Sequence, residues 1–284
     1  MTKQLLSKIE GCYSSMSKGH KRITDYITEN NDKVAFMTAA TLGDAVGVRE
    51  STVVRFASEL GFSGYPQLQK TLQEVVKSRL TSVQRMEAAG GEDMLEHAFS
   101  SDIDTIKATR ESISREAFNA SVEAINRAKH IYVLGVRSAA SLASFAAFYL
   151  NFVYDSVTLI EPAGTGEAFD QAFRINKDDV CIAISFPRYS KQTINMLRFI
   201  SDRGATVISV TDSENSPIAQ FATLLLLARS SMVSFVDSLV APLSLINALI
   251  AAAASEKSGE DYSNLSSLEN IWDEYQIYQT HEDE

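Results

Sequence analysis

The chain has 284 residues, 45% of them hydrophobic and 22% charged, which is ordinary for a globular protein with a sizeable core. Its net charge of −10 argues against a protein that coats nucleic acid indiscriminately, and no uninterrupted apolar run reaches transmembrane length. The N-terminus has no apolar signal core, and Cys12 and Cys181 are lone thiols far apart in sequence. We therefore expect a cytoplasmic protein with two free cysteines.

The first third of the chain reads as a series of short helices. Apolar residues recur at helical spacing over residues 3–16, and Ser17 and Thr38 are placed to cap the next helices. Gly61 is placed to end a later helix, and Pro66 to lie in the first turn of the one that follows. These segments predict a small all-α domain.

Residues 37–66 have the spacing of a helix-turn-helix, whose second helix enters the DNA major groove. Gly47 suits the left-handed position of the turn, and Gly43 lies where the first helix runs closest to the second. A helical hairpin that binds no DNA would need the same buried positions, which are Leu42, Val46, Val48, Val53 and Phe56. The polar side chains that we expect to reach phosphates or base edges are Arg49, Glu50, Ser51, Thr52 and Arg55.

The charge is unevenly divided along the chain. Residues 1–80 hold 11 Lys and Arg against 8 Asp and Glu, whereas the remainder holds 15 against 28. A mildly basic head on an acidic body suits a protein that reads a limited DNA site. The asymmetry alone would not establish DNA binding.

Residues 88–93, with the sequence AAGGED, give the clearest hinge signal, and helical patterns resume at Met94 and again at Arg115. The expected parts are a helix-turn-helix domain at residues 1–80, a linker at residues 81–105 and an α/β domain at residues 106–284.

From His130 onward, short apolar runs alternate with helical patterns. Because these runs are continuously apolar, we expect a parallel sheet that is covered by helices on both faces. A long apolar helix is expected from about Phe235 to Ser255. The five expected strands are residues 131–135, 157–161, 179–186, 205–211 and 223–228.

Ligands of such sheets bind beyond the carboxyl ends of the strands. The loops after the first and third expected strands lead into helix N-termini, which attract anions. Serine hydroxyls could donate to phosphate oxygens there, and Arg188 could bind phosphate through two parallel N–H groups. Alternatively, Ser185 and Ser190 only cap a helix and Arg188 is solvated. The residues expected to contact the ligand are Arg137, Ser138, Ser185, Arg188 and Ser190.

Catalysis would need a general acid or base in the same cleft. None of the four histidines falls in these loops, and Glu161 and Glu167, which flank the loop after the second expected strand, read as polar surface. The sequence therefore favours ligand sensing over turnover.

At these residues the chain resembles the RpiR-type transcriptional regulators. The segment STVVRFASELGFSGYPQLQ is similar to their helix-turn-helix, and DVCIAISFPRYSKQT and RGATVISVTDSENSPIA are similar to strands and loops of the sugar isomerase (SIS) domain. The resemblance implies an all-α helix-turn-helix domain followed by an α/β SIS domain, a five-stranded parallel sheet sandwiched by helices that binds phosphosugars. In that family the SIS domain usually acts as effector receptor and dimerisation unit, not as an enzyme.

Carried across from that family, Ser185 and Ser190 match the hydroxyl positions of the phosphate loop. The chain departs from the family pattern at three places. Pro187-Arg188 stands where the common family loop has Ser-Gly, Arg137 replaces a glycine of the first loop, and Ala139 stands where a hydroxyl is usual, with Ser138 beside it. The added arginine charge keeps phosphate binding plausible while altering how the sugar is contacted.

We therefore expect a transcription regulator that binds double-stranded DNA at a palindromic operator as a homodimer or homotetramer. Its effector is expected to be a phosphorylated sugar, with no cofactor, metal or membrane involved. The alternatives are a sugar-phosphate isomerase with a helical accessory domain, and a metabolite-binding protein whose head contacts protein. Apolar residues at helical spacing around Trp272 could cover a neighbouring subunit or pack on their own domain.

Overall fold

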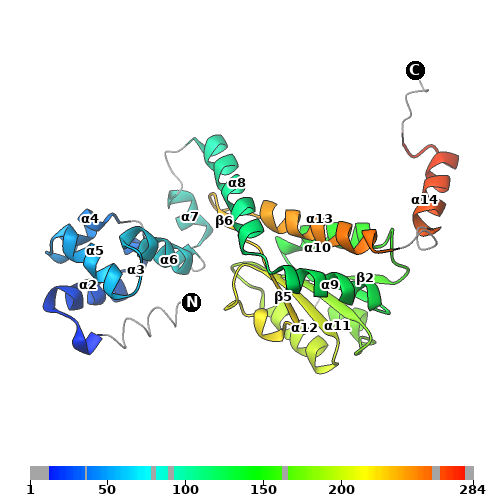
Figure 1. The fold of residues 1–284 in the computed structure, drawn as a ribbon, viewed down its shortest axis with the longest axis horizontal. Coiled ribbons are helices and arrows are strands. Elements are labelled where there is room, and N and C mark those ends of the chain that lie inside the picture. The colour runs from blue at the N-terminus through cyan, green and yellow to red at the C-terminus, as the bar shows by residue number, and fades with distance from the viewer. Residues whose placement is uncertain are drawn as a thin grey trace, which may run out of the picture. The chain divides into compact units, whose positions relative to one another are not determined.

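A computed structural model describes residues 13–35, 37–77, 81–88, 93–161, 166–257 and 263–278. Contacts divide the chain into two units, Met1–Gly90 and Gly91–Glu284, which are described separately (Figure 1). Most of the helix expected at residues 3–16 lies outside the described residues, as do Cys12 and hinge residues 89–92.

The first unit is helical throughout its described part. The predicted caps are confirmed: the Ser17 hydroxyl accepts the His20 N–H at 3.3 Å, and the Thr38 hydroxyl accepts the Thr41 N–H at 3.1 Å. Gly61, at φ 82°, follows the last turn of the predicted second helix of the motif. The elements are η1 (Tyr13–Ser15), α2 (Lys18–Glu29), α3 (Asn31–Val34), α4 (Ala39–Val46), α5 (Glu50–Glu59), α6 (Tyr65–Lys77) and α7 (Ser82–Ala88).

The second unit alternates strands and helices as predicted. Its first half contains α8 (Met94–Ser112), α9 (Arg115–Arg127), β1 (Ile131–Gly135), α10 (Ala139–Leu150), β2 (Val157–Ile160), α11 (Glu167–Ala172) and β3 (Val180–Ile184). Its second half contains α12 (Lys191–Asp202), β4 (Thr206–Thr211), η2 (Ala219–Phe221), β5 (Leu224–Leu227), β6 (Ser231–Met232), β7 (Asp237–Ser238), α13 (Val240–Ser255) and α14 (Ser263–Glu274).

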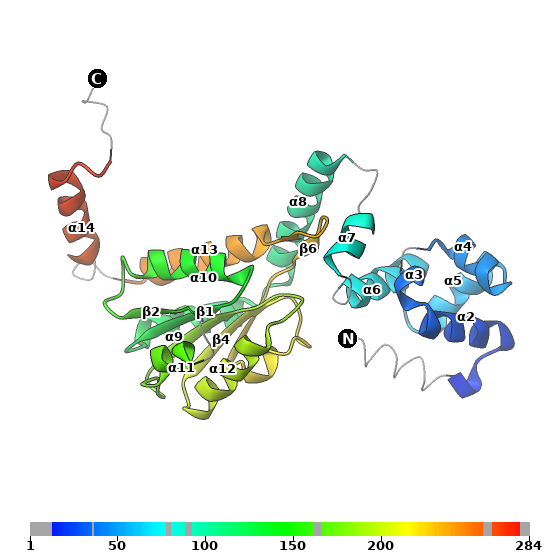
Figure 2. The ribbon, with the colours of Figure 1, turned by 180° about the vertical axis from the view of Figure 1, so that it is seen from behind.

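The five long strands form one sheet in the order β2-β1-β3-β4-β5, and every neighbouring pair is parallel. Alternate residues of each central strand face opposite sides, so the sheet has two buried faces. Helices α9, α10 and α13 cover one face, and α11 and α12 cover the other (Figure 2). The predicted sheet with helices on both faces is confirmed.

The helix expected from about Phe235 begins only at Val240, so this prediction was wrong for its first turn. Ser231–Met232 and Asp237–Ser238 pair as an antiparallel hairpin, β6–β7. The Ser238 hydroxyl also donates to an Asp102 carboxylate oxygen on α8 at 2.5 Å. These bonds hold the backbone before residue 240 outside the helical conformation, although its apolar residues are compatible with a helix.

Cys181 lies on β3 and is fully buried, and burial raises the pKa of its thiol to about 12. The expectation of a free thiol is confirmed for this cysteine, which stays protonated at neutral pH. In the described ranges, no helix is long and apolar enough to cross a membrane.

Within the described residues, helix α14 contacts its own unit through Trp272 and Asn264. Trp272 meets Phe152 edge to face with ring centroids 5.6 Å apart, and the Asn264 amide donates to an Asp155 carboxylate oxygen at 2.5 Å. Of the two expectations for the tail, packing on its own domain is thus seen at these contacts.

Candidate functional site

Helices α4 and α5 form the predicted helix-turn-helix. Gly47 caps α4 at φ 66°, and the Val48 N–H donates to the Gly43 carbonyl at 2.8 Å, which closes the turn. A Cβ atom at Gly43 would lie 2.8 Å from the Val48 carbonyl oxygen and 3.3 Å from the Glu50 nitrogen. Only a glycine therefore lets α4 approach the start of α5 so closely. The predicted core residues Leu42, Val46, Val53 and Phe56 are buried, and Val48 is half-buried.

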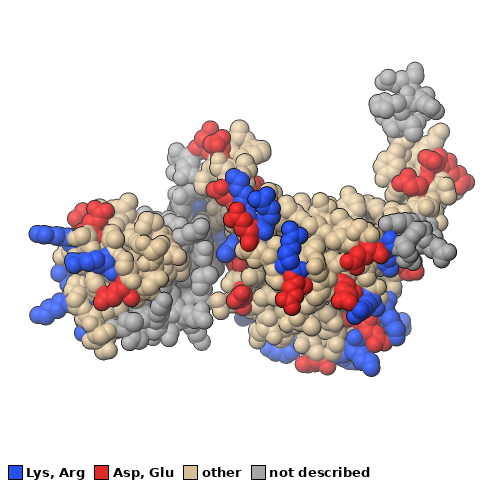
Figure 3. Space-filling view, in the orientation of Figure 1, with Lys and Arg blue, Asp and Glu red and all other residues tan. Residues whose placement is uncertain are grey.

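The polar residues predicted to reach DNA lie at the start and along one side of α5. Arg49, Glu50, Ser51 and Arg55 are exposed, and the Arg55 Nε donates to the Ser51 carbonyl at 3.4 Å. Thr52 differs from the others because it is half-buried and its methyl group faces Gly19 of α2. In Figure 3, Lys and Arg side chains project from the end of this unit where α2, α4 and α5 meet.

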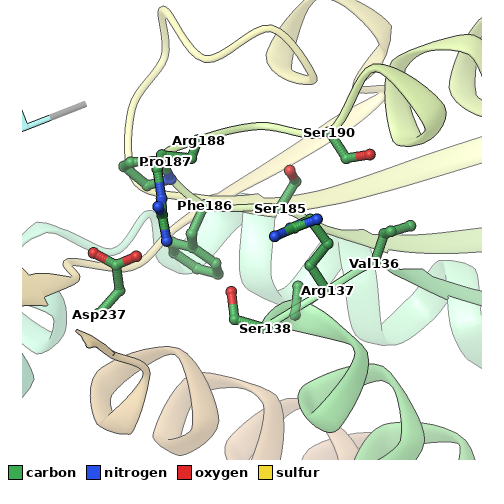
Figure 4. A pocket seen from close by; sticks show the side chains of 10 residues that line it. Val136, Arg137, Ser138, Ser185, Phe186, Pro187, Arg188, Ser190 and Asp237 are labelled. Atoms are coloured by element: carbon green, nitrogen blue, oxygen red, sulfur yellow. The ribbon is translucent and has the colours of Figure 1, made fainter. Parts of the chain in front are cut away.

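In the second unit, the loops after β1 and β3 meet at a cavity of about 440 Å³ (Figure 4). Its volume is in the range typical of small-molecule sites. All five residues predicted to contact the ligand line it, and their role in binding stays a prediction. The lining residues are Val136, Arg137, Ser138, Ala139, Ser185, Phe186, Pro187, Arg188, Ser190 and Asp237.

The end of β1 explains how the first loop reaches the cavity. A Cβ atom at Gly135 would lie 2.5 Å from the Ala139 carbonyl oxygen and 2.8 Å from the Ala143 Cβ. The missing side chain lets α10 begin directly against the strand, which brings the N-terminus of α10 to the carboxyl edge of the sheet. Partial positive charge from the helix dipole is therefore directed at the cavity.

Arg137 and Arg188 both have left-handed backbones, at φ 61° and φ 66°. Residues with a Cβ atom adopt this conformation at a cost of about 1–2 kcal/mol each, which glycine avoids. Both arginines line the cavity, one from each loop. Strained backbone positions cluster at functional sites, so this pair of arginines is consistent with the predicted ligand site.

Arg137, Ser138 and Ser185 converge at one end of the cavity (Figure 4). The residue Ser185 is only 5% exposed, and its hydroxyl faces the cavity. Across the described ranges, neither serine hydroxyl nor the Arg137 guanidinium has a recorded hydrogen-bond or ion-pair partner. Hydroxyl and guanidinium groups can donate hydrogen bonds, so this end of the cavity has the chemistry that an anion requires.

Ser190 both caps a helix and lines the cavity. Its hydroxyl accepts the Gln192 N–H at 3.2 Å, so it caps α12 as the simpler interpretation proposed. It also lines the cavity, where the N-terminus of α12 adds a second helix dipole. Capping and ligand binding are thus compatible at this residue, because a hydroxyl that accepts one bond can still donate another.

The loop that carries Arg188 is held by its neighbour Tyr189. The Tyr189 hydroxyl donates to an Asp212 carboxylate oxygen at 2.6 Å, and the Thr211 hydroxyl donates to the same oxygen at 3.2 Å. Burial and the negative charge of Asp212 raise the pKa of Tyr189, so the phenol remains a donor at neutral pH. This bond ties the loop after β3 to the end of β4.

Sequence analysis missed Asp237, which reaches the cavity from the β6–β7 hairpin. It is the one carboxylate among the lining residues, and in Figure 4 its side chain and that of Arg188 point toward each other at the end opposite Arg137. Nothing in the local sequence marks this aspartate, because it follows β3 by more than fifty residues.

Groups that could act as general acid or base are scarce at the cavity. Glu161 and Glu167 are exposed and do not line it. His130 precedes β1 and is occupied by Ser156 and Thr158 at 2.6 and 2.8 Å, and burial lowers its pKa. Among the described lining residues, Asp237 is a carboxylate and none is a histidine.

Family models match both halves of the chain. The helix-turn-helix domain of the rpiR family matches residues 3–79, and the SIS domain matches residues 124–252. The chain is an RpiR-type protein with a SIS domain.

Similar proteins agree with this assignment. The HTH-type transcriptional regulator HexR of Pseudomonas aeruginosa is 24% identical over 231 residues, which is 79% of this chain and 78% of HexR. The SIS domain of an RpiR transcription factor from Sphaerobacter thermophilus is 28% identical, covers 61% of this chain and 96% of its own, and has a TM-score of 0.57.

The Vibrio vulnificus NanR protein, in its complex with ManNAc-6P, shares the fold over the whole length of this RpiR-type chain. It is 22% identical, the match covers 97% of this chain and all of NanR, and the TM-score is 0.59.

Proposed function

We propose that this chain is a DNA-binding transcription regulator whose operator affinity is controlled by a phosphorylated sugar in the SIS cavity. The observation that carries the proposal is that one chain contains both a helix-turn-helix and a cavity lined by polar side chains. Exposed polar residues lie at the start of the second helix of a helix-turn-helix, and arginine and serine side chains line a cavity at two helix N-termini. The DNA-binding part would comprise residues 1–80, joined by residues 81–105 to an effector domain at residues 106–284.

Relatives support both halves of the proposal. HexR is named as a transcriptional regulator, and NanR is complexed with ManNAc-6P. In this chain the side chains assigned to DNA are Arg49, Glu50, Ser51, Thr52 and Arg55, with Thr52 the most restricted by its burial. Arginines among these would contact phosphates or guanine edges.

Charge complementarity would hold the phosphate of the effector in the cavity. A phosphate presents several strong acceptor oxygens, and Arg137, Ser138 and Ser185 offer matching donors. Arg188 and Ser190 complete the proposed set. A ligand that binds one arrangement of the protein better than another shifts the population toward that arrangement, and operator affinity changes with it.

The β6–β7 hairpin offers a route from the cavity to the rest of the second unit. Asp237 lines the cavity, and the next residue, Ser238, donates to Asp102 of α8. The Arg229 N–H, just before the hairpin, donates to the Thr109 hydroxyl of the same helix at 2.9 Å. Since α8 is the first helix of this unit along the chain, a ligand that moves the hairpin would move the N-terminal helix of the unit.

The regulator would act as a homodimer or homotetramer in the cytoplasm. A helix-turn-helix binds two half-sites through a symmetric oligomer, so we expect a palindromic operator. Turnover of sugar phosphates is not part of the proposal, because no histidine is among the described lining residues and relatives of the chain are named as regulators. A purified protein that isomerises a sugar phosphate without DNA would favour the enzyme instead.

Gel shifts on the DNA upstream of the chain's own gene test the proposal at a stated salt concentration. Arg55→Ala should weaken the specific shift by about tenfold to a hundredfold, the range for loss of one good base contact, and should leave effector binding intact. Lys33→Ala, an exposed basic residue on α3, is the matched control and should shift normally. An unchanged shift with Arg55→Ala would remove α5 as the recognition helix.

A further inference from the structure

The cavity has two chemically different ends. At one end Arg137, Ser138 and Ser185 lie together, so one positive side chain is presented with two hydroxyl groups. At the other end Arg188 and Asp237 point toward each other, so a positive and a negative side chain are presented together (Figure 4). The Phe186 side chain lies between the ends in this view and is 6% exposed.

We propose that the effector is a sugar monophosphate whose sugar end carries no charge, and that Asp237 is the residue that enforces this. The inference rests on the proposed function and narrows its ligand class. The phosphate belongs at the Arg137 end, because that end combines an arginine with two serine hydroxyls and, among the described lining residues, has no carboxylate beside them.

The argument for an uncharged sugar end is one of charge balance. A second phosphate or a carboxylate placed beside Arg188 would also lie beside the Asp237 carboxylate, and like charges in a partly enclosed site repel. A free amine placed beside Asp237 would meet Arg188 in the same way. Hydroxyl groups suit both side chains, since they donate to a carboxylate and accept from a guanidinium.

The backbone supports the assignment of these two residues to recognition. Arg188 occupies a left-handed position at φ 66°, and its loop is tied down by the Tyr189–Asp212 bond. Asp237 is fixed from the other side by the pairing of β6 with β7 and by the adjacent Ser238–Asp102 bond. Both charges are therefore held at the cavity by independent parts of the fold, as a pre-organised polar site requires.

Matched pairs of sugar phosphates test the inference by thermal shift and calorimetry on the full chain. The pairs are glucose 6-phosphate with 6-phosphogluconate, fructose 6-phosphate with fructose 1,6-bisphosphate, and N-acetylglucosamine 6-phosphate with glucosamine 6-phosphate. In each pair that binds, the first member should bind more tightly by about tenfold or more, which corresponds to about 1.4 kcal/mol.

Asp237→Asn removes the charge and keeps the shape of the side chain. It should reduce the preference for glucose 6-phosphate over 6-phosphogluconate by about tenfold, whereas Glu214→Gln, an exposed acidic residue outside the cavity lining, should not.

The inference and the proposed function fail in different ways. If wild-type protein binds the doubly anionic members, or glucosamine 6-phosphate, as tightly as their partners, the inference is overturned and a phosphosugar effector still stands. If neither the sugar phosphates nor inorganic phosphate binds at all, the proposed function falls and takes the inference with it.

Discussion

The helix-turn-helix and the cavity both use left-handed backbone positions, and they fill these positions with opposite kinds of residue. The turn between α4 and α5 has Gly47 at φ 66°, where a Cβ atom would lie 2.5 Å from the Arg22 Nη2. The cavity loops have Arg137 at φ 61° and Arg188 at φ 66°. In the turn the absence of a side chain serves packing. In the cavity, each Cβ atom costs free energy, and on the proposed function the guanidinium that it carries contacts the ligand.

Arg137→Gly should give the largest effect. It separates the contribution of the side chain to ligand binding from its cost to the backbone. Loss of the charged donor should weaken sugar-phosphate binding by about tenfold to a hundredfold, the range for hydrogen bonds to charged groups. The relieved backbone should leave the free energy of unfolding unchanged or raise it, as followed by chemical denaturation. Gln276→Gly, which relieves a left-handed residue at φ 49° outside the cavity lining, is the control and should not change binding. If Arg137→Gly lowered the free energy of unfolding and left sugar-phosphate binding intact, Arg137 would serve the fold and not the ligand.

Gly43→Ala tests the packing role in the helix-turn-helix. The new Cβ atom would lie 2.8 Å from the Val48 carbonyl oxygen, which is backbone and cannot simply rotate away. We expect a loss of about 2 kcal/mol in the free energy of unfolding of the first unit, within the range for overpacking. Gly19→Ala on α2 is the matched control, because its Cβ atom would meet only ordinary contacts at 3.5 Å or more. Equal stability of the two variants would show that α4 and α5 do not need the close approach.

Arg188→Ala should have a smaller effect on ligand binding, about tenfold by calorimetry, because it acts at the sugar end instead of the phosphate end. Alanine keeps the Cβ atom, so the left-handed backbone remains equally constrained and the measured change reports the guanidinium alone. DNA binding without ligand should be unaffected. Undiminished affinity would remove Arg188 from the site.

Ser238→Ala should give the smallest effect. It removes the donor to Asp102 and should reduce the change in operator affinity caused by the effector by about threefold, while ligand affinity is largely kept. Ser244→Ala on α13 is the control, since its hydroxyl bonds only its own helix at the Val240 carbonyl. An unchanged response would exclude the hairpin as the route to α8.

Sequence alone predicted the sheet well because its strands are short apolar runs with no competing pattern, as IYVLG and VCIAI show. The caps at Ser17 and Thr38 were predictable because a hydroxyl at a helix start has few other uses. The start of α13 was not predictable, because Phe235 and its neighbours are apolar enough for a helix, whereas the structure pairs β6 with β7 and bonds Ser238 to the distant Asp102.

The sequence predicted the two loops that line the cavity. It did not predict the β6–β7 hairpin, which contributes Asp237 to the lining. Asp237 could not be placed from sequence, since two-residue strands such as β6 and β7 carry no periodic signal. The left-handed backbones of Arg137 and Arg188 are equally hidden, because arginine gives no local sign of positive φ. The glycines that the family has at these two positions were the signal that could have revealed them.

The central claim is that a sugar phosphate in the cavity changes how strongly the helix-turn-helix binds its operator. The most direct measurement is the operator dissociation constant of the full chain with and without a bound sugar phosphate, in wild type and in Arg137→Gly, at one salt concentration. We predict a change of about five- to a hundredfold in wild type and none in the variant. An effector that binds wild type without altering the dissociation constant, or an equal change in both proteins, would contradict the account.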